Sequence, residues 1–107
     1  MAKNQKKKLR AACRTATFKR DNHKCAVCKC GASANQFDAH HITPRSEMPN
    51  GGYVIENLIT LCYGCHLKAE TFKKNPLPGY SPEELYAIIG SSKELAMRKS
   101  NERMDRI

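Results

Sequence analysis

Two Cys-x-x-Cys pairs constrain the fold of this chain more than any other feature. Cys25 and Cys28 form the first pair, and Cys62 and Cys65 form the second. Four thiols at this spacing suit a closed tetrahedral zinc site, because each pair holds one edge of the ion. We therefore predict a structural zinc ion bound by these four cysteines. The interval between the pairs is longer than in common zinc fingers, so the segment must contain more than a turn.

The chain has six cysteines, and a short chain of this kind could instead be held by disulfides. That interpretation calls for an export signal, but the basic amino terminus lacks the apolar segment of a signal peptide. We therefore favour zinc. Cys13 and Cys30 lie outside the pairs and are expected to be free thiols that behave as small apolar side chains. Cys30 is near enough to Cys28 to compete for the metal, but the two complete pairs make it redundant.

The composition indicates a small protein with a polyanionic partner. The 107 residues allow one domain, and 40% apolar residues without Trp make a modest core that a metal would help to stabilise. Lys and Arg outnumber Asp and Glu by 19 to 10, which gives a net charge of +9 and favours a polyanion as the partner. No apolar run approaches the ~20 residues that span a bilayer. We expect a cytoplasmic protein without a signal peptide, a membrane segment or a small-molecule cofactor.

Residues 1–24 predict a basic helix. They contain nine Lys or Arg residues and one acid, Asp21, and a helix is expected from about residue 6 to 20. A solvated helix face would explain the charge, but the near absence of acids favours contact with phosphates. The side chains expected to contact nucleic acid here are Lys6, Lys7, Lys8, Arg10 and Arg14.

The middle of the chain, residues 25–73, predicts two strands and a helix. One strand is expected over 36–42, and a second apolar strand over 58–61 leads to the second cysteine pair. Residues 53–55, between them, are either a short strand or an extended arm. Because Gly64 is expected to end the second strand, the helix is predicted over residues 66–73.

The carboxyl-terminal part, residues 81–107, predicts helices that flank this core. Ser81, followed by Pro82 and Glu84, is typical of a helix start, and a second start follows at Ser92. The tail is either a surface helix or partly disordered. The predicted fold class is therefore α+β, with a zinc-stapled core between an amino-terminal helix and carboxyl-terminal helices.

Three histidines lie in the segment that the cysteines enclose or border. His40 and His41 fall on the first predicted strand, and His66 falls on the helix. Adjacent strand residues point to opposite faces, so His40 and His41 cannot both bind one metal unless the strand bends. We expect one of them to bind a divalent ion with His66, while the other accepts a proton from an attacking water. A neutral imidazole suits the second task, because its ordinary pKa of about 6.5 leaves it able to accept a proton at neutral pH.

Three separated segments resemble the parts of the HNH endonuclease motif. They are Asp38-Ala-His40-His41-Ile42-x-Pro44, Asn57-Leu58-Ile59-x-Leu61 and Cys62-x-x-Cys65-His66. The segment Arg20-Asp21-Asn22-His23-Lys24-Cys25-x-x-Cys28 is similar to the entry of the zinc-bearing subgroup of that family. The resemblance spans residue 20 to about residue 72. It implies a ββα-metal fold with a treble-clef-like core, which nicks or cuts DNA with one divalent ion.

The resemblance also implies roles for individual residues. His40 and His66 match ligands of the catalytic ion, and His41 matches the general base. Asn57 matches the residue that braces the loop between the strands and so fixes the base. Glu70 lies one helical turn beyond His66, where the fully histidine-lined members have a further ligand. Glu70 would therefore either reach the ion, directly or through water, or pair with a lysine.

The resemblance thus implies two kinds of metal ion, a structural Zn²⁺ and a catalytic Mg²⁺, Mn²⁺, Ni²⁺ or Zn²⁺. Arg45, just after Pro44, is either a phosphate clamp or an ordinary exposed side chain. A zinc-stapled nucleic-acid-binding module without catalysis is the alternative function, because the charge and the cysteines support it equally well. The three histidines favour the endonuclease, since a binding module has no need of imidazoles placed in this way.

Overall fold

The computed structural model describes residues 3–31 and 36–103. Its helices and strands are, in chain order, α1 (Lys3–Arg20), β1 (Phe37–His41), β2 (Leu58–Cys62), α2 (Tyr63–Glu70), α3 (Pro82–Ile88) and α4 (Lys93–Asn101). Three 3-10 turns lie between the strands, namely η2 (Arg45–Glu47), η3 (Pro49–Gly51) and η4 (Ile55–Asn57). The fold is α+β with a ββα unit at its centre, as the sequence predicted.

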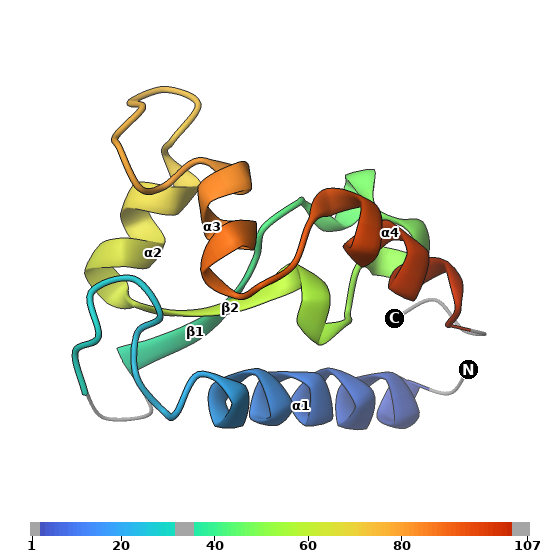
Figure 1. Ribbon diagram of the computed structural model, residues 1–107. Coiled ribbons are helices and arrows are strands. Elements are labelled where there is room, and N and C mark those ends of the chain that lie inside the picture. The colour runs from blue at the N-terminus through green and yellow to red at the C-terminus, as the bar shows by residue number, and fades with distance from the viewer. Residues whose placement is uncertain (1–2, 32–35, 104–107) are drawn as a thin grey trace.

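The two strands pair antiparallel and lie between two layers of helix (Figure 1). Phe37 is opposite Cys62 in the register, and His41 is opposite Leu58. α1 runs along one side of the sheet, and α2 and α3 lie on the other. Helices cover both sides of β2, so its first four residues are buried, whereas β1 buries only Phe37. The other side chains of β1 are therefore available for chemistry.

The end of α1 is fixed to β2 by charged groups. Arg20 pairs with Asp21 at 2.8 Å and donates to the carbonyl oxygen of Leu58 at 2.6 Å. The Asp21 carboxylate accepts a hydrogen bond from the Thr60 N–H at 2.9 Å. The helix was predicted from about residue 6, but it begins at Lys3, because the polar residues at its start have good helix propensity.

α2 spans Tyr63–Glu70, so the prediction of a helix over residues 66–73 was wrong at both ends. The error at the start of the helix came from Gly64, which was taken to end the strand. A glycine in the first turn of a helix is well tolerated, since the N–H groups there lack helical partners in any case. The second cysteine pair therefore starts the helix, with Cys62 as its N-cap and Cys65 in its first turn.

The carboxyl-terminal helices have the predicted caps. Ser81 Oγ accepts a hydrogen bond from the N–H of Glu84, whose carboxylate accepts one from the N–H of Ser81. At α4 the Ser92 Oγ accepts a hydrogen bond from the N–H of Leu95. Residues 104–107 lie outside the described residues, so the expectation for the tail stays a prediction. Within the described ranges, no helix has both the length and the apolar character to cross a membrane.

The segment between the strands turns tightly at Gly52. Its φ is +67°, and a Cβ there would lie 2.7 Å from the side-chain nitrogen of Asn57 and 2.9 Å from Met48 Cβ. Beyond it, Val54 is extended without joining the sheet, so the structure has the extended arm rather than the third strand. Gly52 therefore lets this loop approach the buried Asn57 side chain closely.

Gly52→Ala should destabilise the protein more than Gly90→Ala. Gly90 has a similar φ of +68°, but no atom lies within 4 Å of a Cβ built there. Both variants carry left-handed strain of roughly 1–2 kcal/mol, and only Gly52→Ala adds a clash that costs a further ~1–3 kcal/mol. Urea unfolding of the metal-loaded variants measures the difference. Equal losses in the two variants would contradict the close packing of Gly52 on Asn57.

Candidate metal centres and active site

The four cysteines of the two pairs form one cluster. Their Sγ atoms all lie within 4.8 Å of one another, and those of Cys28 and Cys62 are 3.7 Å apart. Cys25 and Cys65 are buried, whereas Cys28 is exposed. The first pair lies in the turn between α1 and β1, and the second pair joins β2 to α2. One ion bound here would connect both strands and α2.

The chemistry of these thiols suits a metal ion. Burial raises the pKa of Cys65 to about 12, so this thiol stays neutral without a positive partner. A hydrogen bond from the Cys30 main chain lowers the pKa of Cys28 to about 6. A bound cation removes the proton from a coordinating thiol, and four thiolates are a donor set of structural Zn²⁺. All six cysteines are free, so no disulfide competes with this arrangement.

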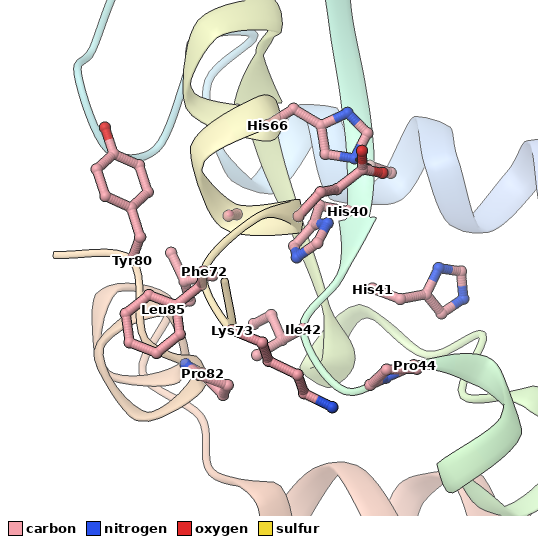
Figure 2. A pocket seen from close by; sticks show the side chains of 13 residues that line it. His40, His41, Ile42, Pro44, His66, Phe72, Lys73, Tyr80, Pro82 and Leu85 are labelled. Carbon is pink, nitrogen blue, oxygen red and sulfur yellow. Dashed lines mark ion pairs between the residues drawn. The ribbon is translucent and has the colours of Figure 1, made fainter. Parts of the chain in front are cut away.

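A second group of metal-binding side chains lies on the α2 side of the sheet. His40, His66 and Glu70 each offer one ligand atom, and these atoms lie within 4.8 Å of one another (Figure 2). The two imidazole centroids are 5.1 Å apart, and Glu70 Oε1 is 3.0 Å from His66 Nε2. Burial, with smaller effects of His66 and His41, lowers the pKa of His40 to about 4, so it is neutral at pH 7. Two imidazoles and one carboxylate fit a divalent ion with positions left for water or substrate.

Asp38 fixes the ring of His66. Its Oδ2 lies 3.3 Å from His66 Nδ1, and its Oδ1 lies 3.4 Å from Arg14. An Nδ1–H that donates to this carboxylate leaves Nε2 unprotonated for a metal ion. Asp38 had no predicted role, although its position two residues before His40 places it on the same face of β1. Arg14, which was predicted to contact nucleic acid, also donates to the Phe37 carbonyl oxygen at 3.1 Å, so much of its guanidinium group is engaged within the protein.

His41 points away from His40, as expected for adjacent strand residues (Figure 2). Its ring packs against Tyr53, with centroids 4.5 Å apart and an angle of 87° between the planes. The Nε2 atom is buried and has no hydrogen-bond partner among the residues that the structure describes. Burial, together with the charges of Arg45 and Arg10, lowers the pKa of His41 to about 4. The imidazole is therefore neutral at pH 7 and able to accept a proton.

Asn57 braces the chain around His41 with all four hydrogen bonds that its side-chain amide can make. Its Oδ1 accepts from the Thr43 N–H at 3.1 Å and from the Tyr86 hydroxyl at 2.7 Å. Its Nδ2 donates to the carbonyl oxygens of Thr43 at 3.1 Å and Gly52 at 3.2 Å. The side chain is fully buried, so each of these bonds is shielded from water. Tyr86, on α3, had no predicted role in this site.

A cavity of about 740 Å³ opens beside the histidines. Its polar side is lined by His40, His41, His66 and Glu70. The other side is mostly apolar and is lined by Phe72, Tyr80, Pro82 and Leu85, with the ammonium group of Lys73 nearby (Figure 2). Although His40 and His41 point apart, both line this cavity, because His41 is the last residue of β1. The volume is in the range of sites that bind small molecules or parts of larger ligands.

Residues 25–72 match a family model described as HNH endonuclease. The chain carries an HNH endonuclease domain. The matched segment contains both strands, α2 and both groups of metal-binding side chains, and it confirms the resemblance seen in the sequence. No curated protein and no solved structure matched the chain in these comparisons.

Basic side chains border the HNH domain on its His41 side. Arg10 of α1 lies over the Tyr53 ring, 5.4 Å from the centroid, and Arg45 lies 5.0 Å from the same centroid. The other predicted contacts, Lys6, Lys7 and Lys8, lie on the amino-terminal turns of α1. The structure therefore brings Arg10 and Arg45 close to His41, whereas the three lysines lie farther along the helix. That any of these residues contacts DNA stays a prediction.

We expect the purified protein to carry about one tightly bound zinc ion per chain. Cys28→Ser or Cys62→Ser should release the ion and unfold the HNH domain. Apparent zinc binding energies of roughly 10–16 kcal/mol are comparable with the whole stability of a small domain. Elemental analysis and circular dichroism measure the two effects.

Cys30→Ser is the matched control, because Cys30 is exposed and lies outside the group of four. This variant should retain its zinc and its fold. Folded wild-type protein without zinc would contradict the assignment, and so would a Cys30→Ser variant that loses the ion as readily as Cys28→Ser.

Proposed function

We propose that this protein is a metal-dependent endonuclease that hydrolyses the phosphodiester bonds of DNA. The observation that carries the proposal is the placement of His40, His66, Glu70 and His41 around one cavity of an HNH domain. The net charge of +9 supports a polyanionic substrate. The basic α1 and Arg45 lie on the His41 side, which supports an approach of the DNA strand from that side.

The reaction needs a nucleophile, neutralisation of charge on the phosphoryl oxygens, and help for the departing alkoxide. His40, His66 and Glu70 would hold one divalent ion, Mg²⁺, Mn²⁺, Ni²⁺ or Zn²⁺. When bound, such an ion neutralises charge on the phosphoryl oxygens and helps the alkoxide to depart. As a Lewis acid it is worth several kcal/mol. Asp38 holds His66 so that Nε2 faces this position. The four cysteines would hold Zn²⁺ in a closed site that serves folding, because four sulfur ligands leave no position for substrate.

In this proposal His41 generates the nucleophile by taking a proton from the attacking water. His41 lines the same cavity as the metal-binding group, which supports a phosphate position between the base and the ion. A bound phosphodiester also adds negative charge beside the ring, which favours the imidazolium that forms. Asn57 keeps the chain beyond His41 in place through Thr43, so the base does not drift.

A nucleic-acid-binding module without catalysis is the second candidate function. The closed four-cysteine cluster and the basic α1 support it as well as they support the nuclease. The group of His40, His66 and Glu70 favours the nuclease, because binding alone requires neither an open metal site nor a neighbouring imidazole.

Removal of the base and removal of a metal ligand should give different defects. On supercoiled plasmid DNA with Mg²⁺, Mn²⁺ or Ni²⁺, His41→Ala should lower the cleavage rate by ~10²–10⁴-fold, while metal and DNA binding stay near wild type. His40→Ala should weaken binding of the catalytic ion, so its rate should partly recover as the metal concentration rises. Plasmid nicking and calorimetric titration of the metal measure the two properties.

His23→Ala is the matched control, since His23 is an exposed residue in the turn after α1. It should cleave DNA like wild type at saturating substrate. A wild-type protein that binds DNA but cleaves none with any of these metals would refute the nuclease and support the binding module. Loss of the catalytic ion from His41→Ala, with retention in His40→Ala, would show that the two roles are reversed.

A further inference from the structure

Tyr53 is the centre of a cluster of rings and cations on the His41 side of β1. Its ring contacts the His41 imidazole, with centroids 4.5 Å apart and an interplanar angle of 87°. The guanidinium carbons of Arg45, on η2, and Arg10, on α1, lie 5.0 and 5.4 Å from the centroid of the same ring. Side chains of α1, β1 and η2 therefore meet on one aromatic ring, and Arg10 of α1 is far from the others in the sequence. Tyr53 belongs to none of the three HNH motif segments.

The backbone around Tyr53 is held by the same amide that braces His41. The carbonyl oxygen of Gly52, the preceding residue, accepts a hydrogen bond from Asn57 Nδ2 at 3.2 Å. Asn57 also binds the N–H and the carbonyl oxygen of Thr43, two residues after His41. One buried side chain therefore sets the positions of both Tyr53 and His41. Their ring contact is a built part of the fold rather than a chance surface contact.

The contact with Tyr53 bears on how the His41 imidazole is oriented. Histidines in active sites are commonly oriented by a hydrogen bond to the ring nitrogen that does not react. In His41 the Nε2 atom is buried, and within residues 3–31 and 36–103 it has no such partner. Edge-to-face packing of aromatic rings has a preferred geometry, so the Tyr53 ring can take over this orienting role.

The two arginines add charge to the arrangement. A guanidinium group stacks on an aromatic face and binds phosphate oxygens through its planar fork of N–H donors. With both groups stacked on Tyr53, two cations lie beside His41. Arg10, Tyr53 and His41 also line a second cavity, of about 280 Å³, on this side of the sheet. Phosphate oxygens bound by these arginines would lie next to the imidazole.

We infer that Tyr53 is a positioning residue for DNA cleavage, whose ring orients the His41 imidazole and keeps the Arg10 and Arg45 guanidinium groups beside it. Base and cations then act on the same stretch of the substrate strand. The inference rests on the proposed function, since it takes His41 to be the base. It requires an aromatic ring at position 53 and makes no use of the tyrosine hydroxyl.

A double-mutant cycle between Tyr53 and His41 tests the inference. Zinc-loaded full-length protein and the variants Tyr53→Leu, His41→Ala and their combination are compared in plasmid nicking at saturating DNA and Mn²⁺. Tyr53→Leu alone should lower kcat by ~10–100-fold, with a smaller change in KM, since displacing a catalytic group slightly has effects of this size. In the His41→Ala background it should lower the residual kcat by less than about 2-fold, because its effect on the chemical step acts through His41 and saturating DNA removes the effect of the arginines on binding. Tyr53→Phe should retain most of the wild-type rate.

Tyr63→Leu is the matched control, because Tyr63 is 75% exposed and this variant should cleave like wild type. Zinc content and thermal unfolding of each variant separate a positioning effect from loss of fold. Tyr53→Met, which keeps a long apolar side chain without a ring, replaces Tyr53→Leu if that variant unfolds. Equal losses with and without His41, or full activity without the ring, would overturn the inference and leave the nuclease intact. An inactive wild-type protein would instead refute the proposed function, and this inference with it.

Discussion

The geometry of the site depends on four thiols that meet at one point. The first cysteine pair precedes β1, Cys62 ends β2, and the four Sγ atoms lie within 4.8 Å of one another. Cys62 is opposite Phe37 in the sheet, so an ion bound there would fix the ends of both strands together with the first turn of α2. His66 follows Cys65 directly, and the same ion would therefore set the direction of a proposed ligand of the catalytic metal. In a chain of 107 residues with a modest core, such a cross-link supplies order that packing alone does not.

Strand β1 separates the two proposed tasks, which are binding of the catalytic ion and acceptance of a proton from water. His40 faces α2 with His66 and Glu70, whereas His41 faces α1 and Tyr53. Because adjacent strand residues point to opposite faces, the base does not compete with the ligands for the ion. Both residues still line one cavity, since β1 ends at His41. The buried hydrogen bonds beyond the strand then keep the base in this position.

The sequence predicted the features whose signals lie within a few residues of one another. The Cys-x-x-Cys spacing, the alternation of the strands and the capping box of α3 are all present in the structure. The start of α2 was missed because Gly64 has a different effect in the first turn of a helix than in a strand. Asp38, Tyr53 and Tyr86 were missed because their contacts are with residues far along the chain. The Tyr86 hydroxyl, for example, binds Asn57, which is 29 residues away.

The protein is proposed to hold two metal ions with separate tasks, one for folding and one for cleavage. Anomalous X-ray diffraction tests this most directly, with crystals of the zinc-loaded protein soaked in Mn²⁺ and data collected on both sides of the zinc absorption edge. We expect a zinc peak among the four cysteines and a manganese peak between His40, His66 and Glu70. A single ion in the cysteine cluster alone, or a second ion bound by His41 in place of His40, would contradict the two-site arrangement.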